Sequence, residues 1–195
     1  MPNKTQSKID SRVIKMIILD RDGVINKDSD NYIKSPAEWL PIEGSIEAIA
    51  ALKKAGYYVT IATNQSGIAR GFYNEATLHA MHEKMANLLS FYHQKIDHII
   101  YCPHGPDDNC SCRKPKAGMI NALLEKFSIH PENCLFIGDT QGDYLASSTA
   151  NTQFVLVKTG KGKRTIKMGN LPADTITYND LSSFVAEFIA HNTRS

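Results

Sequence analysis

The chain has 195 residues, of which 42% are hydrophobic and 22% charged, and its formal net charge is only +2. This length and composition favour one globular domain with a full-sized core, and the small charge argues against a nucleic-acid-binding protein. No apolar run typical of a secretory signal opens the chain, and no stretch approaches the roughly 20 apolar residues of a membrane span. We therefore expect a soluble, cytoplasmic, monomeric protein without a nucleic-acid or membrane partner. Residues 1–11 are expected to be a disordered lead-in, and residues 12–195 a single domain.

The first predicted element is a buried strand over residues 13–19, a segment rich in β-branched and apolar side chains. Asp20 and Asp22 follow it directly, and two carboxylates that repel each other are explained by a divalent cation and not by core packing. The carboxyl ends of parallel strands are where α/β sheets bind ligands. Gly23 lets the backbone turn close to a ligand, although Asp-Gly also occurs in ordinary turns.

A long loop over residues 20–43 comes next, and a loop of this length is expected to shape a substrate entrance. The pattern then predicts a helix that ends at Gly56 and a second strand over residues 57–62. A polar, glycine-containing turn begins at Thr63, again at the carboxyl end of a strand. It is therefore placed to meet the first loop.

Further along the chain, Asn74 is predicted to cap a helix, and a third strand is predicted over residues 96–101. A helix over residues 116–127 and a fourth strand over residues 134–137 follow. This fourth strand leads into Asp139, so that several strands in turn deliver polar residues to one edge of the sheet.

The last part of the chain predicts a fifth strand over residues 154–157, a sixth strand or an edge over residues 174–178 and a terminal helix from Leu181. The intervening basic, glycine-bearing stretch over residues 159–170 is expected to be a loop. The basic side chains in it and next to it are expected to be solvated surface, and attraction of anionic substrates is the alternative. These are Lys158, Lys161, Lys163, Arg164 and Lys167. The alternation of strands and helices implies an α/β fold with a doubly wound, Rossmann-like parallel sheet and no separate cap domain.

Three cysteines and a histidine are crowded into the loop after the third strand. The spacing Cys-x-His-x5-Cys-x-Cys is formed by Cys102, His104, Cys110 and Cys112. Three thiolates and one imidazole suit a closed tetrahedral zinc site, which has a structural role because it leaves no position for water. A zinc-ribbon nucleic-acid module is disfavoured by the tight spacing and by Asp107 and Asp108 within the loop.

In chain order, Asp-x-Asp-Gly at residues 20–23, Thr63, Lys114 and Gly-Asp at residues 138–139 resemble the motifs of the haloacid dehalogenase superfamily of phosphotransferases. The resemblance covers about residues 14–160. More narrowly, the stretches Asp-Arg-Asp-Gly-Val-Ile-Asn, Thr-Asn-Gln-Ser-Gly-Ile-Ala-Arg-Gly and Cys-x-Cys-Arg-Lys-Pro-Lys look like those of the D-glycero-D-manno-heptose 1,7-bisphosphate 7-phosphatases. The related histidinol-phosphate phosphatases share Thr-Asn-Gln and the zinc loop, whose short gap is more like theirs. The stretch Ser-Gly-Ile-Ala-Arg-Gly favours the heptose enzymes.

The resemblance and the chemistry of phosphoryl transfer together imply roles for the carboxylates. Asp20 would attack phosphorus and form an aspartyl phosphate, and Asp22 would act as general acid and then as general base. Mg²⁺ would be held by the carboxylates of Asp20 and Asp139 and, by analogy with the family, by the main-chain carbonyl of Asp22.

Other residues of the motifs are expected to bind the phosphate and the sugar. Lys114 would offset the charge of the nucleophile and of the transferring group, and Arg113 would clamp a second anionic group or make a loop salt bridge. Asp143 is expected to support the metal site, to orient Lys114 or to cap a helix. Further substrate contacts are expected from Asp28, Tyr32, Thr63, Asn64, Gln65, Ser66 and Arg70.

The resemblance implies a phosphatase that requires Mg²⁺, contains structural Zn²⁺ and acts on a small sugar phosphate. The expected reaction is removal of the C7 phosphate of D-glycero-D-manno-heptose 1,7-bisphosphate, in the synthesis of nucleotide-activated heptose for lipopolysaccharide core or surface glycans. Histidinol phosphate is the alternative substrate, and a zinc-stabilised binding module is the non-enzymatic alternative. A dehydrogenase is disfavoured because the first strand does not lead into Gly-x-Gly-x-x-Gly.

Overall fold

The computed structural model describes residue 9 and residues 12–192. Within this part of the chain, six parallel strands form one sheet with the order β3-β2-β1-β4-β5-β6. The strands are β1 Met16–Leu19, β2 Tyr58–Asn64, β3 His98–Cys102, β4 Cys134–Gly138, β5 Gln153–Val157 and β6 Ile176–Tyr178. The predicted doubly wound sheet is confirmed, and its order reverses at β1. Most of the predicted lead-in lies outside the described residues, and Ile9 packs against the core.

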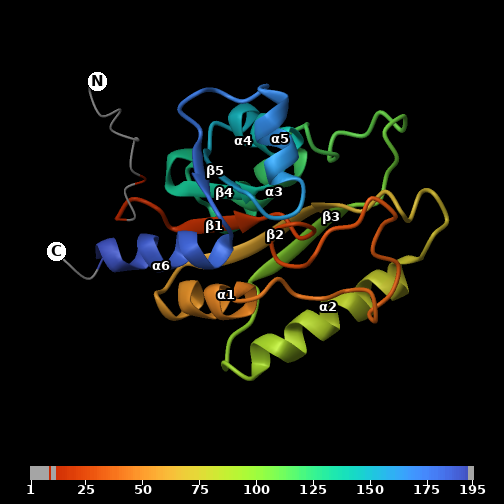
Figure 1. Ribbon diagram of the computed structural model, residues 1–195, viewed down its shortest axis with the longest axis horizontal. Coiled ribbons are helices and arrows are strands. Elements are labelled where there is room, and N and C mark those ends of the chain that lie inside the picture. Colours follow the sequence, from red (N-terminus) through yellow and green to blue (C-terminus); the bar gives the residue numbers. More distant parts are fainter. Residues whose placement is uncertain (1–8, 10–11, 193–195) are drawn as a thin grey trace.

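The helices cover both faces of the sheet (Figure 1). They are α1 Ser45–Lys54, α2 Glu75–Ser90, α3 Gly118–Phe127, α4 Gln141–Thr149, α5 Gly162–Met168 and α6 Leu181–Asn192, with a 3₁₀ turn over Pro131–Asn133. Figure 1 shows α1, α2 and α6 on one side and α3, α4 and α5 on the other. No helix among the described residues is long and apolar enough to cross a membrane.

Strand β1 separates the two cores. Ile17 and Leu19 belong to the cluster that packs under α1 and α6, whereas Met16 and Ile18 belong to the cluster under α3, and all four are fully buried. Successive side chains of a strand point to opposite faces, so that a central strand must be apolar on both. This explains the unbroken apolar run before Asp20.

Several helix ends follow their predicted signals. The side chain of Asn74 accepts a hydrogen bond from the backbone N–H of Thr77 and caps α2. Gly56, with φ of 91°, follows the end of α1 in the left-handed conformation that glycine favours. At α4, the Thr140 hydroxyl and the Asp143 carboxylate form a capping box.

The strand boundaries differ from those predicted. β1 starts at Met16, since Val13 lies in a turn and is 41% exposed. β2 continues to Asn64, because Thr63 and Asn64 remain paired with β3. These two polar residues are therefore held by the sheet itself and not by a turn.

The basic stretch over residues 159–170, predicted to be a loop, contains α5. Its seven residues bury only Gly162 and Thr165, so they lack the apolar stripe by which a helix is recognised in sequence. The helix is instead fixed by tertiary contacts, among them a hydrogen bond of 2.8 Å from the Thr165 hydroxyl to the carbonyl oxygen of Asp139.

The long loop between β1 and α1 packs directly against the core and against α2. Trp39 is fully buried, and the Lys84 ammonium of α2 donates to the carbonyl oxygens of Pro36 and Trp39 at 2.7 and 2.8 Å. In the described chain, one helix lies between β1 and β2 and one between β2 and β3. The absence of a separate cap domain in these segments agrees with the prediction.

Candidate active site

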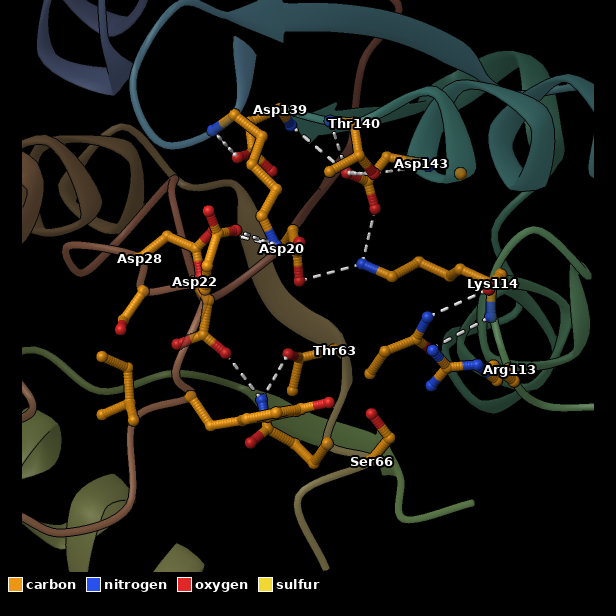
Figure 2. Close-up of a pocket in the computed structure, with 18 of the residues that line it drawn as sticks. Asp20, Asp22, Asp28, Thr63, Ser66, Arg113, Lys114, Asp139, Thr140 and Asp143 are labelled. Atoms are coloured by element: carbon orange, nitrogen blue, oxygen red, sulfur yellow. Dashed lines mark hydrogen bonds and ion pairs between the residues drawn. The ribbon is translucent and has the colours of Figure 1, made fainter. Parts of the chain in front are cut away.

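A cavity of about 390 Å³ lies where the carboxyl ends of β1, β2 and β4 meet the loops after β3 and β5 (Figure 2). It brings together nearly all the predicted site residues outside the zinc loop. These are Asp20, Asp22, Asp28, Tyr32, Thr63, Asn64, Gln65, Ser66, Arg113, Lys114 and Asp139. Arg70 does not line the cavity; it is exposed, and its guanidinium lies 5.9 Å from the centre of the Tyr32 ring.

Asp20 directly follows β1 and is only 8% exposed. Its Oδ1 accepts a hydrogen bond of 2.7 Å from the backbone N–H of Arg21 and lies 2.9 Å from the Lys114 Nζ. Burial raises the pKa of Asp20 to about 7, and the Lys114 ammonium opposes that rise. The carboxylate is thus oriented by fixed donors at the floor of the cavity.

Lys114 is a buried cation between two carboxylates, as Figure 2 shows. Its Nζ lies 2.6 Å from Asp143 Oδ1 and 2.9 Å from Asp20 Oδ1, and it donates to the carbonyl oxygen of Ala62 at 2.9 Å. Burial alone would lower the pKa of this ammonium, but the carboxylates of Asp143 and Asp20 raise it. Lys114 therefore remains charged next to Asp20.

Asn64 holds the backbone of Lys114. The Asn64 Oδ1 accepts from the Lys114 backbone N–H, and the Asn64 Nδ2 donates to the Lys114 carbonyl oxygen, both at 3.0 Å. The end of β2 therefore fixes the loop that carries the lysine.

Asp143 combines two of the roles considered for it. Its Oδ2 accepts hydrogen bonds from the Thr140 hydroxyl and backbone N–H at 2.6 and 3.0 Å, which closes the N-terminus of α4. Its Oδ1 pairs with Lys114. The residue is the third position of the helix, and Thr140 is the cap.

Asp139 directly follows β4 and is 1% exposed. Its Oδ2 accepts from the Lys161 backbone N–H at 2.6 Å, whereas its Oδ1 is buried with no hydrogen-bond partner among the described residues. Burial, with the charges of Asp143 and Asp20, raises the pKa of Asp139 well above its usual value. Carboxylate oxygens of Asp20, Asp139 and Asp143 lie within 4.8 Å of one another. An unpartnered oxygen among crowded carboxylates fits a hard cation such as Mg²⁺.

Asp22 is surrounded by donors. Its two oxygens accept from the Arg21 guanidinium at 2.9 and 3.0 Å, from Asn26 Nδ2 at 2.8 Å and from Gln65 Nε2 at 2.9 Å. Burial favours the neutral acid, but the Arg21 charge and these amide donors lower the pKa of Asp22. Arg21 and Asn26 were not among the predicted site residues. Only their position beside the two aspartates hinted at this contact.

Two cations that line the cavity, Arg113 and Lys161, differ in their surroundings. The Arg113 guanidinium donates to the carbonyl oxygen of His104 at 3.2 Å. Lys161, predicted to be solvated surface, instead lines the cavity, with its Nζ 3.2 Å from Asp28 Oδ2. Lys161 directly precedes α5, and the packing of this helix brings the backbone of Lys161 to Asp139. Lys163 and Lys167 are exposed as expected.

The cysteine loop gathers its four predicted ligands. The Cys102 Sγ lies 3.2 Å from Cys112 Sγ and 3.6 Å from Cys110 Sγ, and the His104 Nδ1 lies 3.3 Å from Cys112 Sγ. A tetrahedron with Zn–S bonds of about 2.3 Å places sulfur atoms roughly 3.7 Å apart. The observed spacing is compatible with zinc.

A doubly wound sheet with Asp-x-Asp-Gly after its first strand, a buried lysine paired to the first aspartate and a further aspartate after β4 defines a phosphatase of the haloacid dehalogenase superfamily. A family model described as polynucleotide kinase 3 phosphatase matches residues 15–168. The D-glycero-beta-D-manno-heptose-1,7-bisphosphate 7-phosphatases of Pseudomonas putida and Pseudomonas aeruginosa are 53% and 49% identical to the chain. The alignments cover 90% and 89% of it, and 100% and 97% of the relatives. The chain therefore belongs to this family of phosphoric monoester hydrolases.

Solved structures agree with this assignment. A crystal structure of D,D-heptose 1,7-bisphosphate phosphatase from B. bronchiseptica, complexed with magnesium and phosphate, has a TM-score of 0.88 and 43% identity. The match covers 91% of this chain and 99% of that one. The corresponding enzyme from Burkholderia thailandensis has a TM-score of 0.71 and 39% identity, with 90% and 99% covered. The resemblance found in the sequence is thus confirmed.

Proposed function

We propose that this chain hydrolyses the C7 phosphate of D-glycero-β-D-manno-heptose 1,7-bisphosphate through an aspartyl phosphate on Asp20. The observation that carries the mechanism is that Asp20 lines the cavity 2.9 Å from the Lys114 ammonium and within 4.8 Å of the carboxylate of Asp139, whose Oδ1 has no hydrogen-bond partner among the described residues. The substrate is inferred from relatives that are up to 53% identical over their whole length.

Mg²⁺ would be held by the carboxylates of Asp20 and Asp139 and by the main-chain carbonyl of Asp22. When bound, it would neutralise charge on the phosphate and on the attacking carboxylate. Zn²⁺ would be held by the cysteine-loop ligands and would stabilise a segment that forms no helix or strand between residues 103 and 117.

In the first step, an oxygen of Asp20 attacks phosphorus and the bond from phosphorus to the C7 oxygen breaks. Asp22 donates a proton to that oxygen, which leaves as the sugar hydroxyl. In the second step, a water molecule gives its proton to Asp22 and attacks the same phosphorus, which releases phosphate and restores Asp20. Lys114 and the Thr63 hydroxyl stabilise the negative charge of the transferring group.

The remaining residues of the cavity would recognise the sugar and its second phosphate. Arg113 lines the cavity and has the planar donor geometry that binds phosphate with two hydrogen bonds. Sugar contacts are assigned to Asp28, Tyr32 and Ser66, with Arg70 supporting the Tyr32 ring. We further propose that the product feeds the cytoplasmic synthesis of nucleotide-activated heptose.

Phosphate release from a panel of esters tests this proposal. We expect the β-anomer of heptose 1,7-bisphosphate to have the highest kcat/KM, and Asp20→Asn to abolish turnover while the control Asp107→Asn, at an exposed loop position, retains it. A higher kcat/KM for histidinol phosphate would overturn the substrate and leave the reaction class intact. Hydrolysis of no ester by the wild type would favour a zinc-stabilised binding module.

A further inference from the structure

Gln65 follows β2 and is 2% exposed, although it borders the cavity. Its Oε1 accepts hydrogen bonds from the Arg21 Nη2 at 3.0 Å and from the Tyr73 hydroxyl at 2.6 Å. Its Nε2 donates to Asp22 Oδ2 and to Thr63 Oγ1, both at 2.9 Å. All four of these contacts are made by side chains of the protein.

The orientation of the amide follows from its partners. A guanidinium can only donate hydrogen bonds, so the amide oxygen must face Arg21, which leaves the amide nitrogen to face Asp22. A primary amide has two donor hydrogens and two acceptor lone pairs. The four contacts fill these positions, so the amide is committed to protein partners and not to a substrate.

The backbone around Gln65 is shaped to admit Tyr73. A Cβ at Gly67 would fall 2.3 Å from the Cε1 of the Tyr73 ring. The glycine therefore leaves the space in which the tyrosine reaches the Gln65 oxygen. Arg21 and Tyr73 thus both hold the amide oxygen of Gln65.

We propose that Gln65 is a positioning residue that aims Asp22 at the leaving-group oxygen. The proposal rests on the role assigned to Asp22 in the proposed function. Two of the donors to Asp22, Arg21 and Asn26, come from the turn that contains Asp22, whereas Gln65 directly follows the neighbouring strand β2, which carries Thr63. Gln65 therefore sets the position of the Asp22 carboxylate relative to the phosphate-binding end of β2.

The inference is tested with two kinds of phosphate ester. An alkyl ester such as heptose bisphosphate needs a proton on its leaving oxygen, whereas an aryl ester such as 4-nitrophenyl phosphate releases a stable phenolate without one. The ratio kcat/KM reports the steps up to release of the first product, so it isolates this protonation.

Gln65→Met removes the four hydrogen bonds and keeps the length of the side chain. We expect kcat/KM for the alkyl ester to fall about 10²-fold, the lower range for a general acid, and that for the aryl ester to fall by less than about threefold. Because Thr63 only accepts a hydrogen bond from Gln65, its hydroxyl can still donate to the phosphate in Gln65→Met. Hydrolysis of the aryl ester should therefore be preserved.

Tyr73→Phe is a milder variant that removes one hydrogen bond and keeps the ring. We expect a selective loss of about 3- to 10-fold on the alkyl ester, which corresponds to one hydrogen bond. The matched control is Tyr92→Phe, since the Tyr92 hydroxyl bonds to Glu47 on the surface at 2.8 Å. It should leave both esters unchanged.

A fall in kcat/KM of Tyr73→Phe for the alkyl ester alone supports the inference, and this test holds even if Gln65→Met does not fold. Equal losses on both esters would indicate a merely structural role and overturn it, as would unchanged values for both. If the wild type hydrolyses another alkyl phosphate but not heptose bisphosphate, the proposed substrate fails, and the comparison is made with that other alkyl phosphate.

Discussion

Lys114 makes the charge balance of the site depend on a single side chain. Its Nζ is within 3 Å of two carboxylates, and its side chain is 3% exposed. Removing one partner of a buried ion pair leaves the other without compensation, which costs much more than the intact pair contributes. The lysine is therefore expected to matter for stability as well as for catalysis.

Lys114→Met should lower the free energy of unfolding by about 3 kcal/mol in metal-free buffer and lower kcat/KM at least about 10²-fold. Urea denaturation and phosphate release measure the two effects. Lys53→Met is a matched control, because the Lys53 Nζ forms an ion pair of 2.6 Å with Asp97 and neither residue lines the cavity. The Lys53→Met variant should therefore keep its activity. Unchanged stability of Lys114→Met would contradict the charge balance described for the site.

At the scale of elements, two glycine turns enclose the Asp139 carboxylate. A Cβ at Gly23, which has φ of +87°, would lie 2.2 Å from Asp139 Oδ2, and a Cβ at Gly160 would lie equally close. The turn after β1 and the turn after β5 thus meet on either side of this side chain. Glycine is required there both by the backbone conformation and by the close approach.

Gly23→Ala should therefore displace Asp139 and weaken Mg²⁺ binding at least about tenfold, as measured by calorimetric titration. Gly56→Ala is the matched control, because Gly56 has φ of +91° and nothing within 4 Å of an added Cβ. Both variants carry backbone strain of about 1 kcal/mol, but the control should bind Mg²⁺ normally. Equal Mg²⁺ affinities of Gly23→Ala and Gly56→Ala would show that the close packing around Asp139 does not determine how tightly Mg²⁺ binds.

The zinc loop carries Arg113 and Lys114 directly after its last cysteine. Cys112→Ser should lose the zinc found by metal analysis and should weaken phosphate-ester binding, since the loop would no longer fix these cations. Cys134→Ala, at a buried position of β4 outside the cluster, should retain the metal. A zinc content unchanged in Cys112→Ser would overturn the assignment of this ligand.

At the scale of the whole molecule, much of the site could be predicted because of one rule of parallel sheets. Alternating strands and helices imply a parallel sheet, whose carboxyl ends share one edge. Polar residues at the ends of β1, β2 and β4 therefore had to lie close together, although Asp20 and Asp139 are far apart in sequence. The cavity contains both.

The remainder depends on contacts that no local pattern encodes. Helix α5 has almost no apolar face, so its existence, and with it the position of Lys161, follows from packing against Asp139. Likewise, sequence alone placed Gln65 near the substrate, but which way its amide faces depends on Arg21 and Tyr73. Side-chain direction at the end of a strand is decided by tertiary neighbours.

The central claim is that Asp20 becomes phosphorylated, and trapping the intermediate tests it most directly. Asp22→Asn should slow hydrolysis of the intermediate, while an aryl phosphate still forms it without protonation of the leaving group. After acid quench and borohydride reduction, peptide mass spectrometry should find homoserine at position 20. Two results would contradict the mechanism. One is reduction at a carboxylate other than that of Asp20, and the other is the absence of any reduced residue although the phenol is released rapidly.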